Sequence, residues 1–170
     1  MDTNLENCLE FKGLLTFNEF KKSHFYCIRK KSLIFVSVLF TIYYVLLSHI
    51  EYENAMSLSI LLSVGVLAIC YLISFIIVKI SFNKNPLTKF QQYYTINSDG
   101  IFIKSKKSSL KLLWKNIVTI HEYDDIFIIK ISYTHVLTIP KRYFNSDKDI
   151  KNFINIILSN EDKISRIILK

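Results

Sequence analysis

The chain has 170 residues, 51% of them hydrophobic, with a mean hydropathy of +0.27 and a formal net charge of +8. This composition, with only 3 Gly and 2 Pro, argues against a disordered protein and is more apolar than most soluble domains. Three cysteines, Cys8, Cys27 and Cys70, lie far apart without a C-x-x-C pair, which argues against a disulfide framework or a zinc knuckle.

Residues 1–31 are mostly polar and are expected to form a cytoplasmic strand and helix. Apolar residues at mostly alternate positions between Leu5 and Leu15 are compatible with a strand. Thr16 and Glu19 then form a T-x-x-E capping box, which predicts a helix start. That helix should run along the inner leaflet or straight into the first apolar segment, and no cleaved signal peptide is expected.

Residues 32–80 are predicted to form a transmembrane helical hairpin. The runs 33–50 and 55–78 contain no Asp, Glu, Lys or Arg. Each approaches the ~20 residues that cross a hydrocarbon core of ~30 Å. The connector 51–54 is short enough only for two antiparallel helices.

Basic residues flank the outer ends of this hairpin, whereas the connector carries two glutamates and no Lys or Arg. Both termini are therefore expected in the cytoplasm, which predicts a multi-pass protein of a bacterial cell (inner) membrane. A stripe of small or hydroxylated residues on each span predicts the helix–helix seam, with a pore lining or a homo-oligomer contact as the alternative. The stripes comprise Ser37, Thr41 and Ser48 in the first span and Ala55, Ser59, Ser63, Cys70 and Ser74 in the second.

Residues 81–170 are predicted to form a cytoplasmic domain that begins as an antiparallel β meander. The apolar period changes from helical to two, and Ser98-Asp99-Gly100 is typical of a turn between two strands. The expected strands cover 90–97, 101–105, 110–113, 118–123, 126–132 and 136–139.

The last segment has the pattern of an amphipathic helix, with Ser146 as its N-cap. Such a helix would cover the open mouth of a curled sheet. The predicted fold class is an α+β membrane protein, in which a two-helix transmembrane hairpin is joined to a small antiparallel β roll capped by this C-terminal helix. The apolar stripe comprises Ile150, Phe153, Ile154 and Ile157, and Ile164, Ile167 and Ile168 extend it past Asn160.

A series of short motifs resembles the YcxB-like family of bacterial membrane proteins. The most distinctive is Ile139-Pro140-Lys141-Arg142, with Phe144 just before the helix. The resemblance covers most of the chain, including the paired spans, and implies a C-terminal domain of pleckstrin-homology-like (PH-like) shape with no assigned activity. The high Ile, Asn and Lys content departs from the usual family composition. The other matching positions are Asp99-Gly100 at the first turn, Trp114 with Ile117, and Glu122 and Asp125 before Phe127.

Motifs for catalysis, metal binding or cofactor binding are not recognisable in this sequence. The four histidines lie in different local settings without metal-ligand spacing. Glu122, Asp124 and Asp125 are better explained as solvated turn residues than as an acid–base pair. No enzymatic activity and no cofactor are expected, and Trp114 is predicted to fill the core.

Basic residues are the candidate binding residues, for anionic lipid headgroups of the bilayer or for a protein partner. Near an anionic leaflet each Lys or Arg contributes about 1 kcal/mol, although solubilising surface charge is an alternative explanation. No nucleic acid partner is expected, because no aromatic recognition motif accompanies the charge and the bilayer is the nearer anion. The candidates are Lys141, Arg142, Lys104, Lys106 and Lys107 in the domain and Arg29, Lys30 and Lys31 before the first span.

Two functional hypotheses follow from this architecture. The first is a membrane-anchored, non-enzymatic binding or scaffold module that presents its cytoplasmic domain to a protein partner or to anionic headgroups. The second is an inner-membrane immunity protein that neutralises a toxin, which a neighbouring toxin gene and growth rescue on co-expression would reveal. Transport ranks third, because two spans form a path only in an oligomer and contain nothing to coordinate a substrate.

Overall fold

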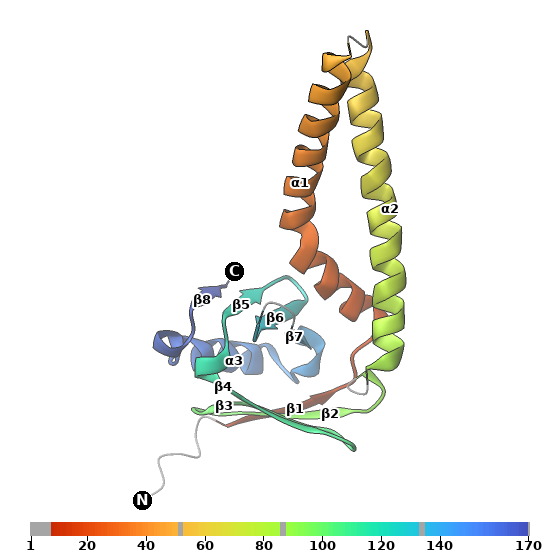
Figure 1. Ribbon diagram of the computed structural model, residues 1–170. Coiled ribbons are helices and arrows are strands. Elements are labelled where there is room, and N and C mark those ends of the chain that lie inside the picture. Colours follow the sequence, from red (N-terminus) through yellow and green to blue (C-terminus); the bar gives the residue numbers. More distant parts are fainter. Residues whose placement is uncertain (1–7, 51–52, 86–87, 133–134, 170) are drawn as a thin grey trace, which may run out of the picture. The chain divides into compact units, whose positions relative to one another are not determined.

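A computed structural model describes residues 8–50, 53–85, 88–132 and 135–169, without the Lys30 side chain (Figure 1). The chain divides into two compact units. One unit, called here the β domain, takes in the chain up to Phe20 and from Asn83 onward, and the other, called the helical hairpin, is Lys21–Phe82. The fold is α+β, as predicted.

Sheet A of the β domain is a four-stranded antiparallel sheet in the order β1-β2-β3-β4. Its first strand precedes the hairpin in the chain and its second strand follows it, yet the two pair directly. The predicted strand between Leu5 and Leu15 is therefore confirmed over the described residues, whereas residues 5–7 lie outside them. The strands are β1 (Leu9–Gly13), β2 (Gln92–Ile96), β3 (Gly100–Lys104) and β4 (Ser109–Leu113).

Sheet B has the order β7-β6-β5-β8, with β5, β6 and β7 antiparallel and β8 parallel to β5. The prediction that the C-terminal helical pattern continues past Asn160 is wrong, because this part of the chain forms the strand β8. The helix ends at Leu158. After the short 3-10 helix η4 (Glu161–Lys163), Ile167 and Ile168 of the expected stripe pair with β5 instead. The strands are β5 (Thr119–Glu122), β6 (Ile126–Lys130), β7 (Val136–Pro140) and β8 (Arg166–Ile168).

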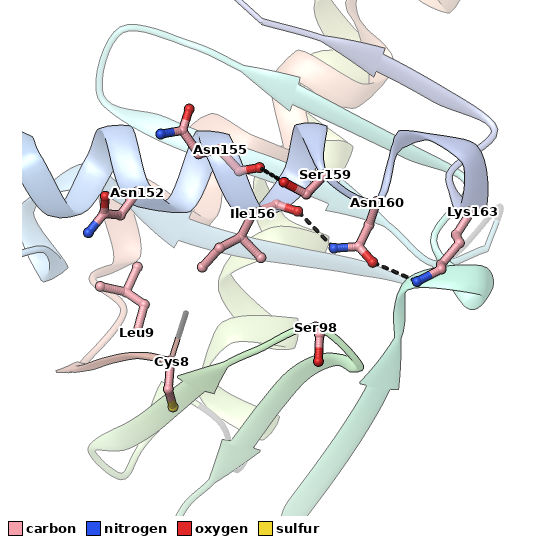
Figure 2. Close-up of a pocket in the computed structure, with 9 residues that line it drawn as sticks. All are labelled: Cys8, Leu9, Ser98, Asn152, Asn155, Ile156, Ser159, Asn160 and Lys163. Carbon is pink, nitrogen blue, oxygen red and sulfur yellow. Dashed lines mark hydrogen bonds between the residues drawn. The ribbon is translucent and has the colours of Figure 1, made fainter. Parts of the chain in front are cut away.

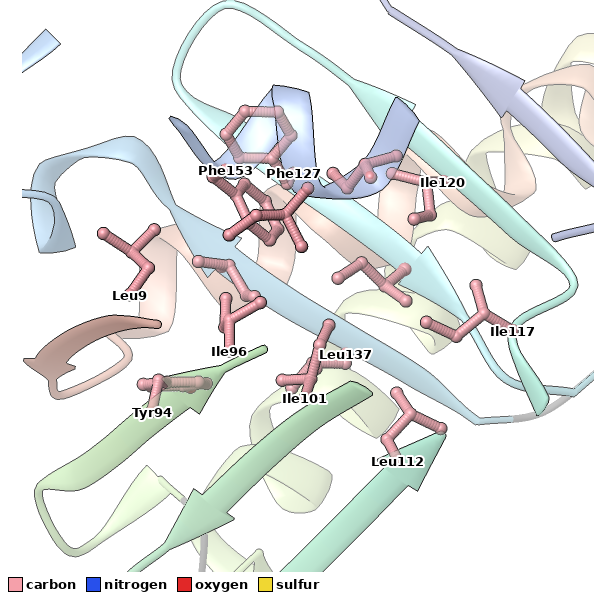
Figure 3. Packing of buried hydrophobic residues seen from close by; sticks show 14 of the residues in the cluster. Leu9, Tyr94, Ile96, Ile101, Leu112, Ile117, Ile120, Phe127, Leu137 and Phe153 are labelled. Carbon is pink, nitrogen blue, oxygen red and sulfur yellow. The ribbon is translucent and has the colours of Figure 1, made fainter. Parts of the chain in front are cut away.

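The helix α3 (Asp147–Leu158) covers the space between the two sheets with its apolar face. Ser146 caps it as predicted, since its hydroxyl accepts a hydrogen bond from the Asp149 amide at 3.2 Å. Phe153, fully buried, packs against Phe127 of sheet B and against Phe144, at 5.0 and 5.4 Å between ring centroids (Figure 3). Trp114, in the 3-10 helix η2 (Trp114–Asn116), is also buried, which confirms its predicted place in the core.

The helical hairpin is formed by α1 (Phe17–His49) and α2 (Ala55–Lys84). The predicted capping box is present at the start of α1, where the Glu19 carboxylate accepts hydrogen bonds from the Thr16 amide and hydroxyl. The segments Lys31–His49 and Ala55–Lys84, with hydropathies of 1.9 and 2.8, are long and apolar enough to cross a membrane. The helix α1 runs without a break into the first of these segments.

The predicted seam of this hairpin is right for one helix and wrong for the other. Ala55, Ser59 and Ser63 of α2 are buried, as expected of small residues between helices. On α1, however, the serine and threonine stripe is exposed, and each hydroxyl donates to a carbonyl of its own helix. Larger side chains of α1 recur at helical spacing and are partly buried, so this face packs inward in place of the stripe. They are Val36, Leu39, Phe40, Tyr43 and Leu47.

Candidate functional site

The strand register of sheet A brings three segments of the β domain to one end of the sheet. Gly13, at the end of β1, lies opposite Gln92 at the start of β2, and Lys104, at the end of β3, lies opposite Tyr93. The chain therefore leaves for α1, returns from α2 and turns from β3 into β4 at the same end. This end, with the β3–β4 turn 105–108, is called here the hairpin end of sheet A.

Three of the predicted basic residues gather at this end. Lys104, the last residue of β3, is exposed, and so are Lys106 and Lys107 of the β3–β4 turn. The turn is closed by a hydrogen bond from the Ser105 amide to the Ser108 carbonyl at 2.8 Å, which fixes the backbone that carries the lysines. The Lys107 ammonium also lies 5.4 Å from the ring centroid of Phe90, in the segment that returns from α2. The turn thus presents three cations in a defined backbone conformation.

Arg142, another predicted candidate, lies in the 3-10 helix η3 (Lys141–Tyr143) and holds the segment that enters α1. Its guanidinium donates to both carboxylate oxygens of Glu19, at 2.6 and 3.0 Å, and to the Leu14 carbonyl at 2.8 Å. Burial raises the pKa of Glu19, but the hydrogen bonds from Arg142 and Thr16 outweigh it, so the pKa lies below its ordinary value. Arg142 therefore has a structural role as a clamp on the start of α1.

Lys141, the remaining candidate in the domain, is also paired inside it. Its ammonium contacts the Glu122 carboxylate at 2.6 Å, and the side chains of Lys141 and Glu122 are 21% and 6% exposed. The same ammonium lies 5.2 Å from the ring centroid of Phe127. The pair joins η3 to sheet B. Lys141 and Arg142 therefore both belong to ion pairs, whereas Lys104, Lys106 and Lys107 are exposed.

Tyr143, the third residue of η3, packs against the hairpin end of sheet A from the core side. Its ring lies so close to Gly13 that a Cβ atom there would be 2.3 Å from it. Burial, reinforced by the negative charge of Glu19, raises the pKa of Tyr143. The neighbouring Tyr94 donates its hydroxyl hydrogen bond to the Gln92 side chain at 2.5 Å. These contacts pack η3 and β2 closely against the end of β1.

Arg29 and Lys31 belong to the helical hairpin, where both are exposed on α1, whereas the Lys30 side chain lies outside the described residues. Two further lysines of α1 lie over aromatic rings of the hairpin, Lys21 at 5.9 Å from the Phe75 centroid and Lys22 at 5.9 Å from the Tyr26 centroid. The Phe25 ring stacks on Tyr71 at 4.6 Å between centroids, which joins α1 to α2. Such mixtures of aromatic and basic side chains are typical of a membrane–water interface.

A groove of about 330 Å³ lies on the opposite side of the β domain, between α3, the start of β1 and the β2–β3 turn (Figure 2). Asn160 is held inside it, because its amide donates to the Ile156 carbonyl at 2.9 Å and its oxygen accepts from Lys163 at 2.8 Å. The lining is mostly polar and lacks an acid or a histidine, so it offers no group for acid–base chemistry. It consists of Cys8, Leu9, Ser98, Asn152, Asn155, Ile156, Ser159, Asn160 and Lys163.

Within the described residues, no three His, Cys, Asp or Glu side chains come together in a way that could hold a metal ion. Two features of the hairpin end were not predicted from the sequence. The first is the ion pair of Glu19 with Arg142. Glu19 was explained by its local capping box with Thr16, so no distant partner was sought for it. The second is Lys111, which shares the outer face of sheet A with Lys104 and which the alternation along 109–113 could have placed there.

Comparison with known proteins adds two findings. Residues 96–157 match the family described as YcxB-like protein. The chain is also 28% identical over 170 residues to the "Uncharacterized protein YcxB" of Bacillus subtilis (strain 168), a match that covers 91% of this chain and 90% of that protein. No solved structure matches.

Proposed function

We propose that this chain, which belongs to the YcxB-like protein family, is a membrane-anchored, non-enzymatic binding module. Its hairpin crosses the bilayer twice, and its β domain lies on the cytoplasmic side. The basic hairpin end of sheet A contacts anionic lipid headgroups of the inner leaflet, and the rest of the domain is available to a protein partner.

The strand order supports a PH-like description of the β domain. A four-stranded meander is followed by a three-stranded one and then by a helix that covers the space between the two sheets. The helical hairpin is inserted in the connection between the first two strands, because residues 14–91 separate β1 from β2. A domain built in this way is anchored through two adjacent strands of its own sheet.

The distribution of apolar surface supports the membrane anchor. Side chains such as Leu33 and Leu61, 65% and 67% exposed, would face water if the hairpin were not in lipid. Basic residues flank both outer ends, and the connector has none, which supports cytoplasmic termini. A C-terminal reporter that is active only in the cytoplasm tests this orientation.

The observation that carries the proposed headgroup contact is the position of the β3–β4 turn. Register and chain connectivity place Lys104, Lys106 and Lys107 at the end of the sheet from which both connections to the hairpin emerge. Three exposed lysines near an anionic leaflet contribute about 3 kcal/mol together. That is enough to orient a domain that is already tethered. No contact or surface of the described residues favours the immunity hypothesis over this one.

Hydrogen–deuterium exchange of the full-length protein in lipid nanodiscs tests the headgroup contact. The amides of residues 105–108 should exchange more slowly in nanodiscs with phosphatidylglycerol than in pure phosphatidylcholine, and added salt should remove the difference. Substitution of Lys104, Lys106 and Lys107 by Glu should abolish it.

The matched control changes the same charge elsewhere on the domain. Lys115, Lys148 and Lys151 are exposed on η2 and α3, and their replacement by Glu should leave the protection of 105–108 intact. Protection that survives in the turn variant, or that is lost equally in the control, would show that the turn does not bind headgroups.

A further inference from the structure

The two sheets of the β domain have four edge strands, and they differ in how far they are covered. The edge strand β1 is contacted by α3 and η3. In β7, all residues after Val136 are buried, and the strand ends at a proline. The strand β8 has three residues. Only β4, among the described strands, combines five residues with a run of exposed ones, Ser109–Lys111, and pairs with β3 alone.

The backbone of β4 offers free hydrogen-bonding groups on the side away from β3. The hydrogen bond from the Ser105 amide to the Ser108 carbonyl sets the register of the β3–β4 ladder. Because bonded and non-bonded pairs alternate in an antiparallel pair, Leu110 and Leu112 are the β4 residues whose backbone groups bond to β3. The residues that direct their amides and carbonyls outward are therefore Ser109, Lys111 and Leu113.

The side chains around this edge carry positive charge. Lys111 stands on the outer face of β4 and shares that face with Lys104, and the lysines of the β3–β4 turn follow directly. The acid on this face, Glu10, lies in the same cross-strand row as Lys111 but on β1, at the other side of the sheet. Leu110, 39% exposed, lies on the other face of β4, where it offers an apolar contact to an added strand.

We propose that the open edge of β4 binds an extended acidic segment of a partner protein, which adds to sheet A as a fifth strand. Backbone hydrogen bonds from alternate β4 residues supply the pairing, and carboxylates of the added strand face Lys104 and Lys111. This deepens the proposed function, because it names the chemistry of the protein partner, and rests on it only in treating the β domain as the binding part.

Single-stranded nucleic acid fits this surface less well than an acidic strand. Base stacking needs open aromatic faces. The Lys111 ammonium lies 5.0 Å from the ring centroid of Phe102, and Lys107 covers Phe90 in the same way. These two rings are therefore covered by lysines, and Tyr93, 53% exposed opposite Lys104, leaves a stacking surface for one base, whereas the β4 backbone offers three outward residues.

The test uses the full-length protein in phosphatidylcholine nanodiscs, which offer no anionic headgroup. The probe is a short fluorescent peptide of alternating Glu and Val, compared with a Lys and Val peptide of the same length and with oligo-dT. The acidic peptide should bind, as measured by fluorescence anisotropy, and should slow hydrogen exchange of the Ser109, Lys111 and Leu113 amides. The basic peptide and oligo-dT should leave these amides unchanged.

Two substitutions at one position separate the backbone contact from the charge. Lys111→Pro removes an outward amide without breaking the β3 ladder, and Lys111→Thr removes the charge and keeps the amide. The proline variant should bind the acidic peptide about fivefold more weakly than the threonine variant, which corresponds to one net hydrogen bond. Trp114 fluorescence verifies that both variants are folded.

Absence of acidic-peptide binding would overturn the proposal. The lysines would then serve to prevent other strands from pairing with this edge. Protection of the same amides by oligo-dT, or equal binding by the two Lys111 variants, would overturn it as well. None of these results bears on the headgroup contact, because that contact is measured with phosphatidylglycerol and the turn lysines.

Discussion

The β domain and the helical hairpin are built from the same aliphatic residues, but these residues are placed in opposite ways. In the β domain, isoleucines such as Ile96, Ile101 and Ile120 are 0% exposed. In the hairpin, Ile34 and Ile69 are 67% and 58% exposed. The core of the domain is therefore stabilised by its own packing, whereas the hairpin exposes apolar side chains that lie in lipid under the proposed membrane anchor. Substitutions should therefore have different consequences in the two regions, and the following predictions use this difference.

The largest contrast is expected for truncation of a buried aromatic residue. Phe153→Ala removes the buried ring that packs α3 against Phe127 and Phe144 and should lower the free energy of unfolding of the β domain by about 3–5 kcal/mol. Leu61→Ala, at a position 67% exposed on α2, should leave it almost unchanged. Denaturant unfolding of the detergent-solubilised chain, followed by Trp114 fluorescence, measures both. Equal losses would mean that the two regions do not differ in packing as described.

Two glycines give a second contrast. A Cβ atom at Gly13 would lie 2.3 Å from the Tyr143 ring, so Gly13→Ala should destabilise the domain by about 1–3 kcal/mol. At Gly65, in α2, an added Cβ meets nothing within 4 Å, and Ala should stabilise the helix by up to about 1 kcal/mol. Thermal unfolding by circular dichroism compares them. A tolerated Gly13→Ala would show that Tyr143 can move away from β1.

The smallest predicted effect concerns the clamp between Arg142 and Glu19. The pKa of Glu19 is lowered in the folded chain. The clamp therefore stabilises the fold fully at pH values above the ordinary glutamate pKa, and this stabilisation is lost as the pH falls through the lowered pKa of the folded state. Glu19→Gln should be destabilised by about 1 kcal/mol at neutral pH, since Arg142 is half exposed.

The difference in unfolding free energy between wild type and Glu19→Gln should shrink as the pH falls through the acidic range. Asp147→Asn, at an exposed position of α3, serves as a control that leaves the clamp intact. A difference independent of pH would contradict an ionised Glu19 in the clamp.

Local signals in the sequence predicted the elements of this chain well. The capping box at Thr16 and the N-cap at Ser146 depend on residues within one helical turn, and strand alternation depends on the next residue but one. For this reason the start of α1, the N-cap of α3 and most strands were predicted correctly. The Asp99-Gly100 turn is confirmed too, where Gly100 has a φ of 159° and an added Cβ would meet the Leu112 carbonyl.

Contacts between distant parts of the chain were not accessible to the same reasoning. Arg142 and Glu19 are 123 positions apart, and nothing in either local sequence indicates the other. The strand β8 was taken for a helix because isoleucines at 164, 167 and 168 fit a helical period, and its pairing with β5 is parallel and nonlocal. The hydroxyl stripe of α1 was misplaced because bonds to the helix's own carbonyls satisfy these groups without a partner helix.

The direct pairing of β1 with β2 has a consequence for the biosynthesis of the protein. The strand β1 leaves the ribosome first, but its partner is made only after the whole of residues 14–91. Under the proposed topology β1 is in the cytoplasm, and β2 can pair with it only after the second span has crossed back to the cytoplasmic side. Sheet A would then form completely only in chains whose two spans have both inserted into the membrane. In a chain whose second span failed to insert, β1 would remain without its partner strand.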